Sequence, residues 1–374
     1  MARLWHGERE RKNFFAAWLF LAPNLIGFLA FTGGPVVLSL FMSFTNWNLK
    51  PAVELEWVGL RNYVDLLQDG YFWFYLYNTL FFMLRIPFTV IGALLLANLL
   101  VEKMLLPGRS RRYTLAGLFG VVGVFTVFIL FAGGNRDAAL MVGVLYLAAV
   151  CGILYGSMTY RTMFYVPSFA AGVATIILWT QVYNPHYGLA NQLLERFYTL
   201  LGIQADLPTW LTSTKSLLGF LPLPEHFSNG GFGLGAREAI MIMGTWMGVG
   251  GNNMILYIAA ISNIPNDLYE AAEIDGAGSF RKFMHVTLPQ VAPTTFFISV
   301  MAVIRGLQGG FNFAKIMTEG GPAGTTTTLA YYIYVAGFEE LRFGYASAVA
   351  WVMFVLIFSL TLVNWKYGNR RVNF

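Results

Sequence analysis

Residues 267–289 of this chain read DLYEAAEIDGAGSFRKFMHVTLP, a polar stretch between two long apolar segments. Asp267 is suited to cap a short helix, and Gly276 to end that helix in the left-handed conformation. A second short amphipathic turn follows with two basic residues, and Leu288-Pro289 is expected to stop it ahead of the next apolar segment. The stretch therefore predicts two short helices that form a polar connection between two spans.

Composition is that of a membrane protein. The chain is 57% hydrophobic, 17% aromatic and 11% charged, whereas soluble domains carry about 25% charged residues. Its mean hydropathy is +0.58. The single cysteine, Cys151, lies in an apolar segment and offers neither a disulfide nor a metal site. The net charge of +5 is distributed as membrane topology requires, so it does not indicate nucleic acid as a partner.

Eight segments are apolar enough to cross a bilayer, which takes roughly 20 residues each. The first follows basic residues, as in a signal peptide, but it is too long and lacks a small-residue cleavage site, so we expect it to be retained. These features predict an all-α polytopic membrane helix bundle with about eight transmembrane helices. The expected spans are Ala16–Met42, Phe81–Val101, Leu115–Ala132, Ala138–Tyr155, Phe164–Val182, Ile240–Ile261, Phe296–Met317 and Tyr345–Val363.

Lysine and arginine residues set the expected orientation, because cytoplasmic loops are enriched in both. With the N-terminus inside, most of the 24 basic residues fall on the cytoplasmic side. This orientation places both termini and the loop 262–290 in the cytoplasm. The basic residues on that side are Arg3, Arg9, Arg11, Lys12, Lys103, Arg109, Arg111, Arg112, Arg161, Arg281, Lys282, Lys366, Arg370 and Arg371.

The loop 262–290 resembles the cytoplasmic coupling loop of ABC importer permeases. The family signature is Glu-Ala-Ala, then Gly after three further residues, and later an aliphatic residue, any residue and Leu-Pro. The surrounding string, which includes Asp275, resembles the carbohydrate branch of the family, and other strings in family order resemble the maltose and glycerol-phosphate permeases of the first type. The matching positions in this loop are Glu270, Ala271, Ala272, Gly276, Val286, Leu288 and Pro289.

The resemblance implies the permease subunit of an ABC importer for a sugar or sugar derivative, in a bacterial or archaeal cytoplasmic membrane. It implies a heterodimer with a second permease subunit, two ATP-binding subunits docked on the coupling loop, and an extracytoplasmic solute-binding protein. The chain has no Gly-x-x-x-x-Gly-Lys-Ser/Thr motif, so we expect no cofactor here and ATP with Mg in the partner ATPase. Its four histidines lack metal-ligand spacing, and no enzymatic activity is expected.

One stretch departs from the family pattern. In the family a short basic loop follows the second span, whereas here two uncharged segments joined by a tight turn lie in its place. We interpret residues 113–160 as an inserted transmembrane hairpin between the N-terminal spans, 1–112, and the permease core, 161–374. A glycine row in its first helix suits close helix contact. The hairpin either faces lipid at the periphery or has a direct role in transport.

Polar residues in the expected seventh span are candidates for the substrate pathway. Arg305, Gln308, Asn312 and Lys315 follow each other at spacings of 3, 4 and 3, which predicts one polar stripe on a helix, with Phe311 close by. Ionisable groups are costly in lipid, so the stripe is expected to face the bundle interior or water. Alternatively, Lys315 and Arg305 snorkel to the two interfaces and leave Gln308 and Asn312 buried.

The expected sixth span adds Trp246, Asn252 and Asn253 to the candidate pathway, among four glycines. Glycines loosen a helix, and freed carbonyl groups are tolerated in a membrane where they line a cavity. The alternative is close helix packing with Trp246 as an interfacial anchor. In the second span, a snorkelling Arg85 beside a kink at Pro87 accounts for both residues.

The loop 183–238 is expected outside the membrane and is rich in aromatic residues, including Trp210. It is either a docking surface for a solute-binding protein or packs onto the bundle itself. The rival function is an ion-coupled secondary transporter of a polar solute. Such a transporter is expected to hold paired carboxylates within its spans, and the expected spans contain neither aspartate nor glutamate.

Overall fold

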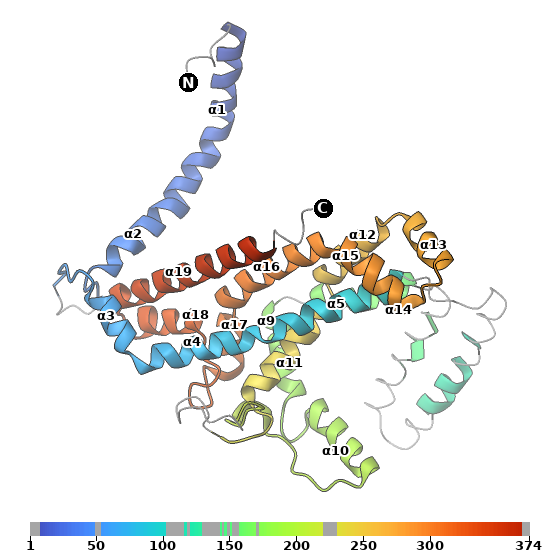
Figure 1. The fold of residues 1–374 in the computed structure, drawn as a ribbon. Helices are drawn as coiled ribbons and strands as arrows, with labels where there is room; N and C mark the ends of the chain where they lie inside the picture. Colours follow the sequence, from blue (N-terminus) through green and yellow to red (C-terminus); the bar gives the residue numbers. More distant parts are fainter. Residues whose placement is uncertain are drawn as a thin grey trace. The chain divides into compact units, whose positions relative to one another are not determined.

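The computed structural model of the chain is helical (Figure 1). It describes residues 8–48, 54–101, 116–117, 120–128, 143, 146–147, 150–151, 157–169, 172–219 and 230–368. Within these residues there is no β-strand, and only two isolated bridges pair extended segments, Thr45 with Trp57 and Ser216 with Phe232. The all-α prediction is therefore confirmed for the described part of the chain.

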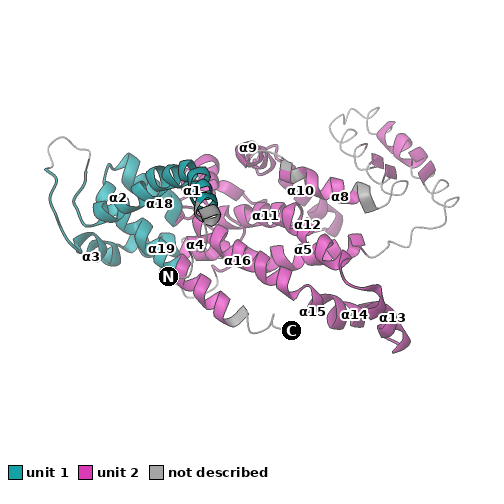
Figure 2. Ribbon diagram, turned by 90° about the horizontal axis from the view of Figure 1, so that it is seen from above, with its two compact units in different colours: residues 1–76, 329–356 teal, residues 77–328, 357–374 magenta. Residues whose placement is uncertain are grey.

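The chain divides into two compact units (Figure 2). Unit 1 comprises Met1–Leu76 and Leu329–Leu356. Its core consists of apolar and tyrosine side chains, among them Leu66, Phe72 and Tyr332. The helices that lie wholly or partly in unit 1 are α1 (Glu8–Phe28), α2 (Gly34–Ser43), α3 (Arg61–Gln68), α4 (Gly70–Met83), α18 (Leu329–Tyr334) and α19 (Phe343–Gly368).

Unit 2 comprises Tyr77–Thr328 and Ile357–Phe374. Its longer helices are α5 (Arg85–Val101), α8 (Ser157–Tyr165), α9 (Gly172–Val182), α10 (Leu189–Leu201), α11 (Ala236–Val249), α12 (Asn252–Ser262), α13 (Asn266–Ile274) and α16 (Ala292–Gln308). Its short helices are α14 (Ser279–Lys282), α15 (Leu288–Gln290) and α17 (Phe311–Phe313).

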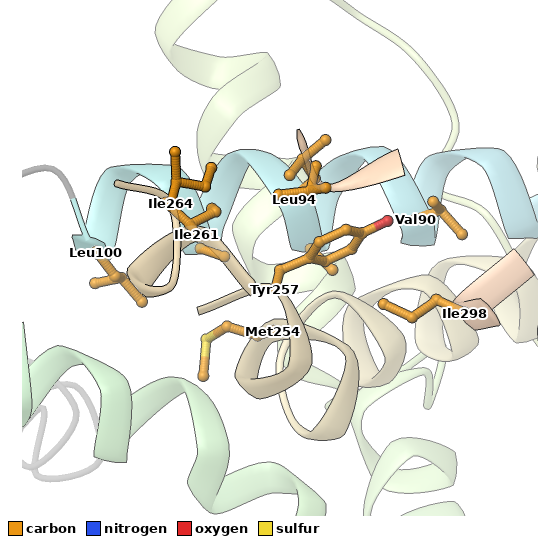
Figure 3. Packing of buried hydrophobic residues seen from close by; sticks show 11 residues of the cluster. Val90, Leu94, Leu100, Met254, Tyr257, Ile261, Ile264 and Ile298 are labelled. Atoms are coloured by element: carbon orange, nitrogen blue, oxygen red, sulfur yellow. The ribbon is translucent and has the colours of Figure 1, made fainter. Parts of the chain in front are cut away.

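The core of unit 2 is organised around α5, which packs against α11, α12 and α16. Val90, Leu94 and other buried residues recur on α5 at helical spacing and form one stripe. Figure 3 shows this stripe beside Met254 and Tyr257 of α12, and Tyr257 donates a hydrogen bond to Thr295 Oγ1 of α16 at 3.1 Å. The cluster therefore fixes α12, and with it the start of the 262–290 loop, to the second span.

Four described helices are long and apolar enough to cross a membrane: Lys12–Ser43, Gly70–Val101, Ala292–Thr318 and Phe343–Lys366. They correspond to the first, second, seventh and eighth expected spans. The second is longer than predicted, because the aromatic segment that starts at Gly70 continues the helix instead of forming a loop. Pro87, which cannot donate a backbone hydrogen bond, accounts for the single-residue break at Leu84.

The fifth and sixth expected spans are broken helices. In the fifth span, α8 ends at Tyr165 and a 3-10 turn follows at Val166–Phe169, around Pro167. Helix α9 then begins at Gly172. The sixth consists of α11 and α12, which are separated at Gly250-Gly251. Gly251 has φ +68°, a conformation that side chains disfavour, so the helix cannot continue through it.

In the described part of the chain, four segments are π-helical, namely Leu29–Gly33, Phe283–Thr287, Ala314–Thr318 and Val335–Glu339. The first two lie directly before a Gly-Pro or Leu-Pro pair. A proline ring clashes with the carbonyl group four residues earlier and has no N–H to bond it. A wider turn relieves that clash, which explains how these helices pass a proline without ending.

The expected third and fourth spans and the turn between them lie mostly outside the described residues. Two described pieces of this stretch contact each other: the ring of Tyr146 lies within 2.7 Å of the Cβ position at Gly123. Gly117 and Gly120, the other members of the glycine row, have no described neighbour within 4 Å of that position. Only Gly123 therefore shows the close approach that the row predicts.

Candidate functional site

The coupling segment, residues 262–290, begins with α13. This helix ends as predicted: Gly276 has φ +74°, its N–H donates to Glu273 O at 3.0 Å, and Ala277 N–H donates to Ala272 O at 2.8 Å. This pair of bonds is a Schellman cap, which satisfies the last carbonyl groups of the helix. The predicted start was wrong. The helix begins at Asn266 after Pro265, and Asp267 lies in its first turn, where it complements the helix dipole instead of capping.

Leu288-Pro289 does not stop the second part of the segment, contrary to the prediction. The chain stays helical from α14 through the π segment Phe283–Thr287 into α15, which contains Pro289. Leu288 N–H donates to Phe283 O five residues earlier, so the widened turn accommodates the proline. The segment is therefore a nearly continuous rod that leads into α16, and not a turn followed by a break.

Three kinds of contact hold the coupling segment together. Lys282 Nζ lies 2.6 Å from Glu273 Oε1 and links α14 to α13. The hydroxyl groups of Tyr269 and Thr287 lie 3.0 Å apart, and Thr287 is buried. Partly buried side chains of the segment also pack on the α5–α12–α16 core, namely Tyr269, Phe283, Val286 and Leu288. The segment is thus tied both to itself and to the membrane helices.

Two large apolar side chains of the coupling segment are exposed. Ile274 is 87% exposed and Phe280 is 75% exposed. Ile274 belongs to the string that resembles the carbohydrate branch, but sequence reasoning gave neither residue a role in coupling. Glu270, Ala271 and Asp275 are exposed as well, whereas Ala272 is partly covered. The structure thus places the predicted coupling residues within α13–α15, on the same segment that exposes Ile274 and Phe280.

The candidate pathway residues of the sixth span lie around its break. Trp246 is 53% exposed and packs edge-on against Trp179 with ring centroids 5.4 Å apart. Asn252, the first residue of α12, accepts a hydrogen bond from Tyr165 at 3.3 Å, and Asn253 donates to Gly248 O at 3.2 Å. Asn253 therefore satisfies one of the carbonyl groups that the break frees.

The polar stripe predicted for the seventh span does not lie on one continuous helix. Gly309 is extended and Gly310 has φ +101°, so α16 ends at Gln308 and α17 starts afresh at Phe311. Arg305, Gln308 and Asn312 are all exposed in the chain, on either side of this break. After the break, Asn312 lies in the short α-helix α17, whereas Lys315 lies in the π-helical segment Ala314–Thr318, over the ring of Phe311 at 5.6 Å. Arg305, Gln308 and Asn312 are thus exposed on two helices that meet at a break, and not on one polar face as their spacing predicted.

A cavity of about 840 Å³ lies between α4, α5, α8 and α11 of unit 2. Its wall is mostly apolar and aromatic and includes Trp246, whereas Arg305, Gln308, Phe311 and Asn312 do not line it. The structure therefore brings together only part of the predicted pathway. The residues that line this cavity are Phe81, Leu84, Phe88, Met163, Phe164, Leu217, Leu218, Glu238, Met241, Ile242, Thr245, Trp246, Val249 and Gly250.

A buried polar network near this cavity was missed by sequence reasoning. Arg237 is 1% exposed and donates to Asn78 Oδ1 at 2.8 Å and to Thr325 O at 3.0 Å. Its neighbour Glu238 accepts from Ser216 Oγ at 2.8 Å and from the backbone of Leu217 at 2.9 Å. Buried charges with these hydrogen bonds are stable, and they tie α11 to α4 and to the segment that follows Gly324.

The segment 183–238 packs partly on its own unit. Trp210 is buried and donates to Asn191 Oδ1 at 2.7 Å, and the hydroxyl of Tyr183 donates to Ala239 O at 2.8 Å. Residues 220–229 lie outside the described part. In contrast, α10 exposes apolar side chains, with Leu200 83% exposed and Phe197 54% exposed. Trp210 therefore packs within unit 2, as one of the two alternatives predicted, whereas α10 exposes apolar side chains.

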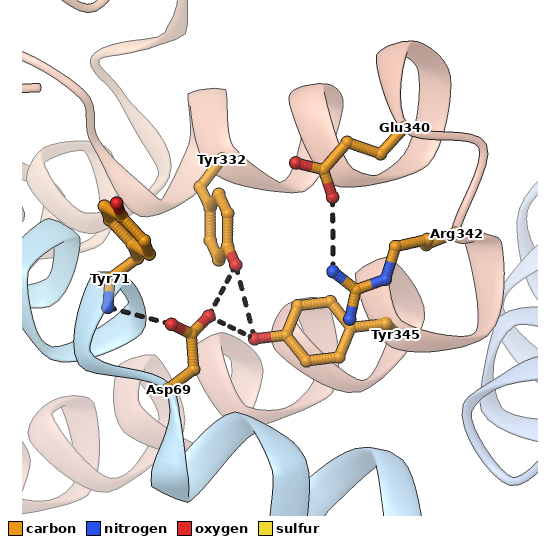
Figure 4. A network of polar contacts seen from close by, with 6 residues as sticks. All are labelled: Asp69, Tyr71, Tyr332, Glu340, Arg342 and Tyr345. Carbon is orange, nitrogen blue, oxygen red and sulfur yellow. Dashed lines mark hydrogen bonds and ion pairs between the residues drawn. The ribbon is translucent and has the colours of Figure 1, made fainter.

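Unit 1 contains a separate polar cluster (Figure 4). The Asp69 carboxylate accepts hydrogen bonds from the hydroxyl groups of Tyr332 and Tyr345, each at 2.7 Å. Burial raises the pKa of the Tyr332 hydroxyl, so it remains a donor at neutral pH. Arg342 lies over the Tyr345 ring at 4.2 Å and pairs with Glu340. This cluster joins α18 and α19 to the start of α4 within unit 1.

Comparisons with known proteins agree with this architecture. Residues 138–370 match the family of binding-protein-dependent transport system inner membrane components. The chain is 30% identical to the probable ABC transporter permease protein YesP of Bacillus subtilis, over 97% of this chain and 94% of that protein. It is 26% identical to the sn-glycerol-3-phosphate transport system permease protein UgpA of Yersinia pestis, over 98% of this chain and 99% of that protein.

A solved structure shares the fold. It is that of a bacterial alginate ABC transporter in complex with an alginate pentasaccharide-bound periplasmic protein, with a TM-score of 0.67 and 21% sequence identity over 98% of both chains. The matches confirm the resemblance to ABC importer permeases, and the family match contains the whole coupling segment. The chain is therefore a multi-pass membrane protein that belongs to the family of binding-protein-dependent transport system inner membrane components.

Proposed function

We propose that this chain is one permease subunit of an ATP-driven ABC importer for a sugar or sugar derivative. It works with a second permease, with two ATP-binding subunits that hold ATP and Mg, and with an extracytoplasmic solute-binding protein. The distribution of lysine and arginine supports cytoplasmic termini and a cytoplasmic coupling segment. The substrate class is supported by UgpA, named for sn-glycerol-3-phosphate, and by the alginate transporter.

The coupling segment is the observation that carries this proposal. It is rigid, because a Schellman cap, an ion pair and core packing fix it, and it exposes Ile274 and Phe280. Large apolar side chains held outward on a polar segment are typical of a protein interface. Glu270, one turn before Ile274 on α13, and Asp275, which follows Ile274, are exposed and carry negative charge that suits a basic partner surface. An ATPase docked here moves α13 and α16 together, since the ion pair and the Tyr269–Thr287 contact link α13 to the nearly continuous helical rod that leads into α16.

The test replaces Ile274 and Phe280 with glutamate and measures co-purification of the ATP-binding subunits from membranes. We expect at least about a tenfold loss of bound ATPase, because each glutamate replaces an apolar anchor with a charge in a contact that excludes water. Leu200→Glu on α10 is the matched control, since it places the same charge on an equally exposed apolar residue elsewhere. Full ATPase recovery with the double variant contradicts the coupling role.

We propose that the substrate pathway includes both groups of predicted residues. Trp246, Asn252 and Asn253 surround the break in the sixth span, and Arg305, Gln308, Phe311 and Asn312 surround the break in the seventh. Breaks within spans leave backbone groups that a passing polar solute or water satisfies. The exposure of Gln308 and Asn312 in the single chain supports a surface shared with the second permease.

We also propose that residues 113–160 form the inserted hairpin. The contact of Gly123 with Tyr146 supports two helices side by side. Deletion of this stretch removes two spans together, so the orientation of every later loop is expected to be unchanged. Labelling of single cysteines at Leu200 and Ser279 from opposite sides of the membrane reads that orientation, and reversed labelling in the deletion variant contradicts the proposal.

A further inference from the structure

An arginine lies near the middle of a membrane-length apolar helix. Arg85 belongs to Gly70–Val101, and the nearest charged residues in the sequence are Asp69 and Glu102. Each is about 24 Å or more away along the helix, at about 1.5 Å per residue. An ionisable side chain within a span is costly unless it reaches water or a partner. That Arg85 snorkels to the outer interface stays a prediction.

Glycines of α11 make room for this arginine. The Arg85 guanidinium lies against Gly244, at the position that a Cβ atom would occupy. One turn further along both helices, Thr89 lies against Gly248 in the same way. Two glycines at i and i+4 open a groove along α11, as in other close helix contacts in membranes. The groove at these glycines thus fixes the Arg85 side chain in the contact between α5 and α11.

Among the residues that the structure describes, no hydrogen bond or ion pair involves the guanidinium of Arg85. The nearby hydroxyl of Thr89 donates to the Arg85 carbonyl oxygen at 2.9 Å. Arg237, the other arginine of this region, is bonded to Asn78 and Thr325. The hydrogen-bond donors of Arg237 are therefore bonded within the fold, whereas those of Arg85 are available to another molecule.

The 840 Å³ cavity lies beside the contact of Arg85 with Gly244. Leu84, which precedes Arg85, and Thr245, which follows Gly244, both line it. Phe88 and Trp246 supply aromatic faces, and aromatic faces beside polar groups are a surface on which a sugar ring binds. The carboxylate of Glu238, which also lines the cavity, is already occupied by its own donors.

We propose that Arg85 recognises an anionic group of the transported carbohydrate, either a carboxylate or a phosphate. This inference rests on the proposed import of a sugar. A guanidinium binds both groups through paired charge-assisted hydrogen bonds, which are stronger where water is excluded. An anion also neutralises a cation whose burial in lipid is otherwise costly. Arg85 therefore selects acidic sugars over neutral ones.

The test uses proteoliposomes that contain the complete transporter with its binding protein. Uptake is measured for cellobiose, maltose and lactose and for the uronate and 6-phosphate derivatives of each. The readout is the ratio of kcat/KM for an acidic derivative to that of its neutral parent. Arg85→Gln removes the charge, Arg85→Lys keeps it, and Arg61→Gln is the matched control at an arginine whose side chain is 77% exposed.

We expect the wild type to favour a uronate or a phosphate, and Arg85→Gln to lower the ratio by at least about tenfold, as expected when one charge-assisted hydrogen bond is lost. The lysine variant keeps an intermediate ratio, because it retains the charge but loses the paired hydrogen bonds, and Arg61→Gln keeps the wild-type ratio. If Arg85→Gln does not assemble, Gly244→Ala, which displaces the guanidinium without removing charge, is expected to lower the same ratio. The uronate and phosphate derivatives identify which anion is bound.

Two results overturn the inference and leave sugar import standing: a wild type that imports neutral parents as well as acidic derivatives, or an unchanged ratio in assembled Arg85→Gln or Gly244→Ala. A wild-type transporter that imports none of the nine compounds contradicts the proposed function, and the inference with it.

Discussion

The coupling segment and the seventh span show two ways in which a short run of sequence becomes a functional surface. In the coupling segment, residues close in sequence form local caps, an ion pair and a hydrogen bond, and their spacing alone predicted the end of α13. In the seventh span, Gly309-Gly310 interrupts the helix. The polar residues are spaced as on one helical face, but the break lies between them, so they do not share a face. Helical periodicity is informative only within one uninterrupted helix.

The largest effect is expected at Gly276. Proline there cannot adopt φ +74°, so Gly276→Pro destroys the cap of α13 and should lower transport by at least about tenfold while the protein still inserts. Gly278→Ala is the matched control, because Gly278 has φ −70° and open space at its Cβ position. Transport in proteoliposomes measures both. Equal transport by the two variants shows that the coupling segment does not need its cap.

The second prediction concerns the residues on either side of the break at Gly309-Gly310 in the seventh span. Gln308→Leu and Asn312→Leu remove hydrogen-bonding groups at similar volume, so we expect about a tenfold loss of sugar uptake with basal ATP hydrolysis preserved. Ile316→Leu changes an exposed residue of the same region without a polar loss. Unchanged uptake kinetics in both polar variants would assign the pathway to the sixth span alone.

A smaller effect is expected inside the coupling segment. Tyr269→Phe and Thr287→Val each remove one side of a partly buried hydrogen bond and should each lower stability by about 1 kcal/mol. A double-mutant cycle on thermal unfolding of the assembled complex isolates the pair. A coupling energy near zero indicates that packing, and not this bond, holds α13 to the π segment.

The smallest effect is expected at the ion pair of Lys282 with Glu273, whose side chains are 21% and 62% exposed. Lys282→Gln should lower stability by at most about 0.5 kcal/mol, since solvent screens such pairs. The difference from wild type should shrink as salt is raised. A difference that is large and independent of salt would show that Lys282 acts through packing of its stem.

Several features were predictable because they depend on few neighbouring residues. The membrane class follows from composition, the four long spans from their high apolar content, and the cap at Gly276 from a glycine after a short helix. Errors arose where several residues compete. Leu288-Pro289 stops a regular α-helix but not a π-helix, and Asp267 competes with Pro265 for the helix start. No pattern in the sequence indicates that Ile274 and Phe280 are exposed, so only the structure shows it.

The sequence by itself determined the membrane class, the expected sidedness and the coupling segment, because apolar length, charge placement and glycine conformation act locally. Only the tertiary structure decided where the sixth and seventh spans break and what lies beside each residue. Arg85 illustrates the difference. In the sequence it is one arginine near a proline, whereas in the fold two glycines of α11, distant in sequence, open the groove that holds it beside an aromatic cavity. Such a site depends on contact between helices, and contact between helices is not encoded in the periodicity of either one.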